Sequence, residues 1–205
     1  GAIDSLNLFD LDELIIFSFY WTNRDRYRRV LDIGANIGLH SIIMNKCGFE
    51  INAYEPDPLH FKLLNRNLAL NNCSKVQTFN TAVSAKSGER EFVRVLGNTT
   101  ASHLAGSKSN PYGDLERFTV KVDSIENLME RADLMKIDVE GNEKEILLST
   151  RREHWMNTDA LIEVQDEDNA ASIYDHFRKL KVSFFSQKTG WRKVLTVDDM
   201  PTSYH

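Results

Sequence analysis

Short apolar runs alternate with longer amphipathic segments along most of the chain, beginning at Val30. This alternation is typical of βαβ units, in which helices join parallel strands. The apolar runs predict strands at residues 30–33, 51–54, 76–80, 134–138 and 160–164. The amphipathic segments predict helices at residues 36–47, 58–71, 124–131, 142–152 and 169–180. The pattern therefore favours an α/β fold built on a mostly parallel sheet.

Two regions depart from this alternation. Residues 91–95 and 118–122 have the polar and apolar alternation of strands, and a polar stretch rich in glycine and serine separates them at about 96–117. A loop of that length inside a compact domain often has a functional role. Near the C-terminal end, residues 182–186 and 193–197 flank a Thr-Gly turn. We expect these two segments to form an antiparallel hairpin that closes the sheet.

The first 29 residues predict a helical extension that packs on the rest of the chain. Asp10 and Glu13 make a capping-box pattern ahead of an apolar helix. No repeat or low-complexity linker divides residues 30–205, which we expect to form one domain. A cluster of arginines joins the extension to this domain, and we interpret it as a solvated turn. Its members are Arg24, Arg26, Arg28 and Arg29.

Composition narrows the possible classes of protein. The chain has 205 residues, 41% of them hydrophobic and 27% charged, which is typical of a globular domain with a substantial core. Its net charge of -5 supplies no positive field that would attract DNA or RNA. Cys47 and Cys73 cannot build a disulfide framework or a four-ligand zinc site, which favours a reducing, cytoplasmic compartment. No segment approaches the roughly 20 apolar residues that a membrane span needs.

The most informative stretch is V-L-D-I-G-A-N-I-G at residues 30–38, where an apolar strand runs into a turn that opens a helix. Gly34 and Gly38 would let the backbone approach a ligand, and the first turn of the helix offers unpaired N–H groups. The G-x-x-x-G spacing differs from the G-x-G-x-x-G of dinucleotide sites. A tight connection between a strand and a helix could use the same glycines without any ligand.

Glu55 ends the second predicted strand, in the context A-Y-E-P-D-P. Ligands of open α/β sheets bind outside the carboxyl ends of the strands, where an acidic residue can accept hydrogen bonds from ribose hydroxyls. A glycine turn after the first strand and an acid after the second therefore predict a cofactor that contains a nucleoside.

These residues resemble the FkbM-type S-adenosylmethionine-dependent methyltransferases, which have the class I methyltransferase fold. The resemblance covers about residues 30–193. Its motifs are D-I-G-A-N-I-G at 32–38, E-P-D-P at 55–58, A-V-S at 82–84, V-D-S-I at 122–125 and M-K-I-D-V-E-G-N-E at 135–143. The resemblance implies a Rossmann-like, mostly parallel sheet of seven strands, with helices on both faces and a C-terminal antiparallel hairpin. It also implies O-methylation, often of sugar or natural-product hydroxyls.

The resemblance assigns residues of this chain to the cofactor, S-adenosyl-L-methionine. The residues implied on its methionine side are Asp32, Gly34, Ala35, Asn36 and Gly38. Those implied at the ribose are Glu55 and the adjacent Pro56, and those implied at the adenine are Ala82 and Val83. Asp138 is placed where the transferable methyl group would lie.

Candidate catalytic residues lie at the ends of later strands. Asp138 and Glu140 are two residues apart, so they would share one face of an extended chain. A hydroxyl nucleophile must lose a proton, and a carboxylate within hydrogen-bond reach would speed this by roughly 100-fold or more. Glu163, at the next strand end, could complete an acidic pocket or bind a backbone turn. His103, in the long loop, is a further candidate base. Acids near Asn142 could instead stabilise the start of a helix.

One departure from the family concerns metal binding. Many relatives carry a histidine two residues after the equivalent of Glu163, whereas this chain has Gln165. This difference argues against a histidine base or a metal ion there, and we expect no metal.

The expected acceptor is a hydroxyl of a glycan or small molecule, with residues 96–117 shaping its entry. The motifs leave the acceptor and the oligomeric state open, because many chemistries share them. Two alternatives stay open. One is an RNA ribose 2′-O-methyltransferase that uses the arginine cluster. The other is a non-catalytic interaction domain with this fold.

Overall fold

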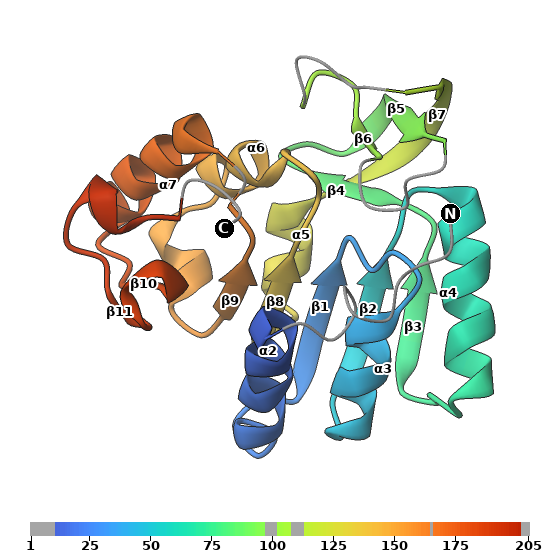
Figure 1. The fold of residues 1–205 in the computed structure, drawn as a ribbon, viewed down its shortest axis with the longest axis horizontal. Coiled ribbons are helices and arrows are strands. Elements are labelled where there is room, and N and C mark those ends of the chain that lie inside the picture. Colours follow the sequence, from blue (N-terminus) through green and yellow to red (C-terminus); the bar gives the residue numbers. More distant parts are fainter. Residues whose placement is uncertain (1–10, 97–101, 108–112, 165, 202–205) are drawn as a thin grey trace.

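The computed structural model describes residues 11–96, 102–107, 113–164 and 166–201. At its centre is a five-stranded parallel sheet with the strand order β3-β2-β1-β8-β9 (Figure 1). Its strands are β1 (Arg29–Ile33), β2 (Glu50–Tyr54), β3 (Val76–Phe79), β8 (Leu134–Ile137) and β9 (Asp159–Ile162). The predicted parallel sheet is therefore confirmed. The strand order reverses between β1 and β8, the place where open α/β sheets bind their ligands.

Helices cover both faces of this sheet. On one face, Tyr20 of α2 (Leu11–Thr22), Met44 of α3 (Leu39–Lys46) and Leu64 of α4 (Pro58–Leu70) pack in one core. The core on the other face includes side chains of α5 (Ile125–Met129), α6 (Glu143–Leu148) and α7 (Glu167–Leu180). β1 contributes to both cores, with Val30 on one side and Leu31 on the other, as the alternation of side chains along a strand requires.

Local sequence explains where these helices begin. Asp57 caps α4, because its carboxylate accepts a hydrogen bond from the N–H of Leu59 at 2.8 Å, and Pro58 stands in the first turn. Asp166 caps α7 in the same way, through the N–H of Asn169 at 2.7 Å. Asp10, which the sequence predicts as the cap of the first helix, lies outside the described residues.

A second sheet lies beyond the carboxyl ends of β1 and β2 (Figure 1). Its strand order is β4-β7-β5-β6, and it consists of β4 (Ala82–Ser84), β5 (Gly88–Val95), β6 (His103–Leu104) and β7 (Leu115–Ser124). β5 and β7 are antiparallel and pair over the whole length of β5. The stretch 96–117, predicted as a loop, contains β6 and the start of β7, while residues 97–101 and 108–112 lie outside the described part.

The prediction of a seven-stranded sheet is wrong for the described residues, whose parallel sheet has five strands. The strands predicted at 91–95 and 118–122 belong to the second sheet, because β5 and β7 pair with each other and β7 pairs with β4. The C-terminal segments do form an antiparallel hairpin, from β10 (Phe185–Ser186) and β11 (Arg192–Lys193). This hairpin is a separate two-stranded sheet. The short helix η2 (Gln187–Thr189) lies between β10 and β11 in the sequence. Only two residues of each strand therefore pair with the other strand.

Two further short helices are η1 (Arg152–Trp155) and η3 (Val197–Asp199). Within the described ranges, no helix combines the length and the apolar character needed to cross a membrane.

Candidate active site

Most of the predicted site residues line one pocket, between the carboxyl ends of β1, β2 and β8 and the second sheet. They are Gly34, Asn36, Glu55, Pro56, Ala82, Val83, Asp138 and Glu140. Four separate stretches of sequence supply them, and the fold brings these stretches together because the strand ends meet at one edge of the sheet.

The turn after β1 requires glycine at its first position. Gly34 has φ +80°, and a Cβ atom there would lie 1.7 Å from the backbone oxygen of Asp138. The N–H groups of Gly34 and Ala35 both donate to the carbonyl of Tyr54, at 3.1 and 3.0 Å. The turn is therefore held by β2 on one side and packed against the end of β8 on the other.

Glu55 is buried at the end of β2, with 5% of its surface exposed. Its two carboxylate oxygens accept hydrogen bonds from the backbone N–H groups of Asn36 and Asp57, each at 2.8 Å. Burial raises the pKa of Glu55 to about 7, against the lowering effect of these hydrogen bonds. Each oxygen keeps a second lone pair, so the carboxylate can accept further hydrogen bonds from a ligand.

Lys136, in β8, brings a positive charge to the site. It links the end of β8 to the turn after β1. Its ammonium group donates to the carboxylate of Asp138 at 3.0 Å and to the carbonyl of Gly34 at 3.2 Å, and it lies 3.8 Å from Asp32. Burial alone would lower the pKa of Lys136, but the charges of Asp138 and Asp32 outweigh burial and raise it. Lys136 is therefore charged at neutral pH.

Asp138 and Glu163 form a hydrogen-bonded pair of acids with different charges. Burial alone would raise the pKa of Asp138, but the charge of Lys136 and hydrogen bonds from Glu163 and Lys136 outweigh it and lower this pKa to about 2. Burial and the nearby charge of Asp138 raise the pKa of Glu163 to about 10. At neutral pH Asp138 is therefore ionised, and Glu163 is protonated and donates to it.

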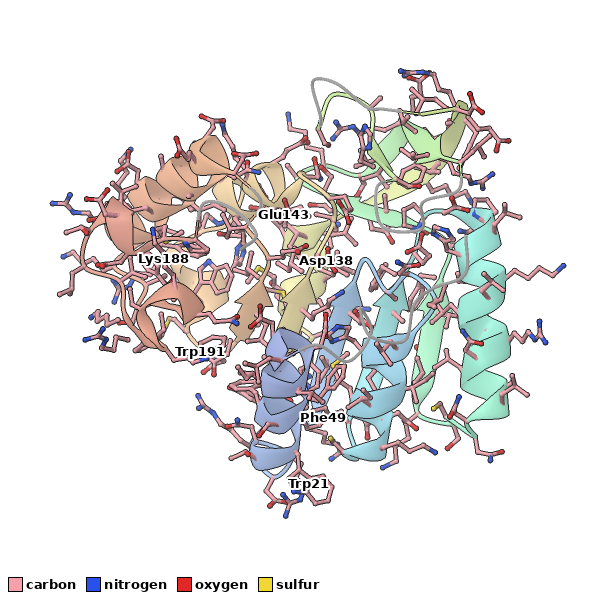
Figure 2. The ribbon with its side chains drawn as sticks, in the orientation of Figure 1. Trp21, Phe49, Asp138, Glu143, Lys188 and Trp191 are labelled. Atoms are coloured by element: carbon pink, nitrogen blue, oxygen red, sulfur yellow. The ribbon has the colours of Figure 1, made fainter. Side chains whose placement is uncertain are left out.

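Glu143 lies beside this pair, and Figure 2 shows it close to Asp138 above the strand ends. Oxygens of Asp138, Glu143 and Glu163 lie within 4.8 Å of one another, a spacing that could hold a metal ion. However, Glu143 is fully buried and accepts hydrogen bonds from the N–H groups of Val139 and Gly141, at 2.9 and 3.0 Å. Its contacts stabilise the turn that carries Glu140, and Lys136 already supplies positive charge to Asp138.

The structure places other predicted residues behind the pocket wall. Asp32 is fully buried below the turn, where its carboxylate accepts a hydrogen bond from the hydroxyl of Ser41. Gly38 caps α3 with φ +95° and packs against Leu64. Ala35 is also buried, with 5% of its surface exposed. Glu163 reaches the site through its hydrogen bond with Asp138.

His103 belongs to strand β6, not to a loop, and is 2% exposed. Its neighbours Ser102 and Leu104 line the pocket. Side chains alternate along a strand, so His103 is directed to the other side. The structure thus does not bring His103 into the pocket. Gln165 lies outside the described residues.

Several pocket residues were not predicted from the sequence. They include Tyr54, His60, Thr81, Phe92, Leu104 and Asn142. Phe92 and Leu104 come from the second sheet, and no local motif marks them. Lys136 was also missed as a site residue. Its position two residues before Asp138, on the same side of the strand, was the available signal.

The arginine cluster lies at the end of the parallel sheet where its strands begin, opposite the pocket. Arg26 pairs with Asp159 at 2.6 Å, and Arg28 pairs with Glu50 at 2.9 Å. Arg29 pairs with Asp133 at 2.8 Å. The first pair joins the turn before β1 to the start of β9, and the other two join the start of β1 to the starts of its neighbours β2 and β8. All three lie at the end of the sheet opposite the pocket.

Comparison with known proteins identifies the family. A family model described as the methyltransferase FkbM domain matches residues 32–187, which is more than half of the chain. The chain belongs to this family. It therefore carries an S-adenosylmethionine-dependent methyltransferase domain.

Two curated relatives of this chain are named as methyltransferases. The chain is 34% identical to methyltransferase sdnD of Sordaria araneosa, in a match that covers 62% of this chain and 61% of the relative. It is 28% identical to methyltransferase 1 of Beauveria bassiana, with 62% and 59% covered. The chain thus spans about three fifths of the length of these relatives. A solved structure, methyltransferase FkbM from Methylobacillus flagellatus, aligns with a TM-score of 0.42 and 19% identity, over 62% of this chain and 29% of that chain.

Proposed function

We propose that this domain transfers a methyl group from S-adenosylmethionine to a hydroxyl oxygen of a sugar or another small molecule, and that Asp138 receives the hydroxyl proton. The observation that carries this proposal is the charge arrangement at the end of β8. Lys136 and Glu163 both donate to Asp138, which keeps it ionised. Asp138 lines the pocket, so an ionised carboxylate is available to a bound acceptor.

The pocket residues fit the parts of S-adenosylmethionine. We assign Glu55 to the ribose, because it is a buried carboxylate with lone pairs left for two adjacent hydroxyls. Ala82 and Val83 supply an apolar wall that suits a flat base. Gly34 and Asn36 bring backbone close to the ligand at the turn, where Gly34 has no room for a side chain. The same assignment leaves Asp138 and Glu140 for the reacting end.

Chemically, the bound cofactor supplies an electrophilic methyl group on a positively charged sulfur. Transfer forms a bond between the acceptor oxygen and the methyl carbon, and it breaks the bond between carbon and sulfur, whose electrons stay on sulfur. The hydroxyl proton passes to Asp138. This proton becomes strongly acidic as the new bond forms, so a weakly basic carboxylate suffices. Residues that align the acceptor can contribute on the order of 7–11 kcal/mol to the rate.

Cofactor binding is the first test. Calorimetry with S-adenosylhomocysteine is expected to show a saturable complex with the folded chain. Methyl turnover would then be measured by mass spectrometry with a panel of sugar, phenol and aliphatic hydroxyl acceptors. Failure of the folded chain to bind S-adenosylhomocysteine would contradict the proposal.

The second test concerns Asp138. We expect Asp138→Asn to lower turnover by roughly 100-fold or more, because the amide cannot accept the proton. The matched control is Asp168→Asn, which removes an exposed acid that pairs with Lys144 on the surface. Equal turnover of Asp138→Asn and the control would contradict the role of Asp138.

A further inference from the structure

Strand β5 presents three alternating residues to the part of the chain that holds the five-stranded sheet: Arg90, Phe92 and Arg94. Phe92 lines the pocket. Arg90 pairs with Glu145 of α6 at 2.8 Å, and Arg94 pairs with Asp57 at 2.6 Å. The second sheet is therefore attached to α6 on one side of Phe92 and to the start of α4 on the other.

The pair of Arg94 and Asp57 is the more buried of the two attachments. Nε of Arg94 donates to one carboxylate oxygen of Asp57 at 2.6 Å, and a second guanidinium nitrogen donates to the other at 2.7 Å. The side chain of Asp57 is fully buried and that of Arg94 is 11% exposed. Such two-point pairs between a guanidinium and a carboxylate fix both distance and orientation. The ring of Phe118 packs on the guanidinium, 4.8 Å from its centre.

Asp57 connects this pair to the proposed ribose ligand. Its carboxylate caps α4 and its backbone N–H donates to the carboxylate of Glu55 at 2.8 Å. Glu55 is thus held at one oxygen by a residue whose own side chain is fixed by Arg94. Among the described residues, Arg94 makes no hydrogen bond to Glu55 and does not itself line the pocket, although its charge helps to lower the pKa of His60, which does.

We propose that Arg94 is a positioning residue for the cofactor: it fixes Asp57, and through the N–H of Asp57 it fixes the Glu55 carboxylate that binds the ribose. This inference rests on the proposed role of Glu55. It makes the second sheet part of the cofactor site, because the nucleoside end is fully ordered only when β5 is docked on the start of α4.

The same sheet offers a matched control. Arg117 of β7 pairs with Glu91 of β5 at 2.6 Å, and both side chains are 49% exposed. Arg117→Gln removes a guanidinium and an ion pair from the same two strands, but without contact to α4. It therefore reports the effect of losing an arginine from this sheet.

The experiment measures the affinity for S-adenosylhomocysteine by calorimetry, with urea unfolding as a check on folding. We expect Arg94→Gln to bind at least tenfold more weakly than the wild-type chain, and Arg117→Gln to stay within twofold. Arg94→Lys keeps the charge but lacks the two-point geometry, so an intermediate affinity is expected. If Arg94→Gln does not fold, the affinity of Arg94→Lys is compared with that of Arg117→Gln instead.

A double-mutant cycle separates positioning from a general structural role. In a Glu55→Gln background the carboxylate is already lost, so Arg94→Gln is expected to weaken binding by less than twofold more. A structural role would give the full tenfold loss in both backgrounds, and that result would overturn the inference. Equal affinities of Arg94→Gln and Arg117→Gln would overturn it as well. Absence of binding by the wild-type chain would instead contradict the proposed function itself.

Discussion

The ammonium group of Lys136 lies 3.0 Å from the carboxylate of Asp138 and joins the end of β8 to the turn after β1. This contact determines the charge of the site. It helps to hold Asp138 ionised, while burial and the charge of Asp138 keep the proton on Glu163. Burial and the lysine together therefore give two neighbouring acids different protonation states, the arrangement that separates acid and base roles in many active sites.

Replacing Lys136 with methionine is expected to change the pH dependence of turnover. Loss of the ammonium charge raises the pKa of Asp138, so the acid limb of kcat/KM moves to higher pH. Because the substitution also leaves the fully buried Asp32 without its neighbouring cation, we expect the free energy of unfolding to fall by about 3–5 kcal/mol. The pH–rate profile measures the first effect and urea unfolding the second. Lys144→Met, which removes a surface ion pair, is the control, and an unshifted acid limb in Lys136→Met would contradict the prediction.

Glu163→Gln is expected to behave differently from Asp138→Asn. Glu163 is protonated at neutral pH, and a glutamine amide can donate to Asp138 in the same way, so turnover at pH 7 is expected to stay within about threefold of wild type. Asp138→Asn is expected to lose roughly 100-fold or more. A large loss of turnover in Glu163→Gln would show that Glu163 acts in its ionised form.

Stability gives an independent measure of the proton on Glu163. The folded-state pKa of Glu163, about 10, lies above the ordinary value of 4.5, so the folded chain holds a proton that the unfolded chain has lost between these values. The free energy of unfolding therefore falls as pH rises through this window. Glutamine does not titrate, so the stability of Glu163→Gln relative to wild type is expected to increase from pH 6 to pH 9. Urea unfolding at these two values checks the sign.

The sequence was sufficient for the parts of the site that depend on local pattern. The strand before Gly34 and the strand before Asp138 are short apolar runs, and their carboxyl ends must meet at one edge of a parallel sheet. This rule alone predicts that Glu55 and Asp138 lie near one another. The glycine at position 34 was predicted for close approach to a ligand, and the structure shows that it is also required by the backbone of Asp138.

The rest of the site depends on contacts between distant segments. Phe92 faces the pocket only because β5 pairs with β7 and the second sheet docks on α4, which no local pattern specifies. His103 was predicted in a loop because its flanks are polar, yet pairing with Val93 makes it a strand residue. The charges of Asp138 and Glu163 depend on burial and on the distance to Lys136, and a sequence gives neither quantity.

Gly34→Ala is expected to be far more destabilising than Gly48→Ala. Both glycines have positive φ, +80° and +100°, so alanine strains the backbone at either position by roughly 1–2 kcal/mol. Only at Gly34 does the new Cβ also overlap the backbone oxygen of Asp138, whereas nothing lies within 4 Å at Gly48. We expect a loss above about 4 kcal/mol, or failure to fold, for Gly34→Ala. Equal urea midpoints for the two variants would contradict the close packing of the turn on β8.

Cofactor affinity is expected to increase with pH around neutrality. The pKa of Glu55 is about 7, so the carboxyl is mostly protonated at pH 6 and mostly ionised at pH 8. The protonated group carries its own O–H and presents fewer acceptor sites to the ribose and to the N–H groups of Asn36 and Asp57. If only the ionised form binds, the change in ionised fraction makes S-adenosylhomocysteine bind about tenfold more tightly at pH 8 than at pH 6.

Two variants assign this pH dependence to a residue. Glu55→Gln is expected to bind more weakly and with the same affinity at both pH values, because glutamine does not titrate. His60, whose ring lies 4.0 Å from Glu55, is another titratable group of the pocket, and burial lowers its pKa further below neutrality. His60→Gln is therefore expected to keep the dependence on pH. A dependence that persists in Glu55→Gln and disappears in His60→Gln would move the titrating role from the carboxylate to the imidazole, and the ribose assignment of Glu55 would then lose its main support.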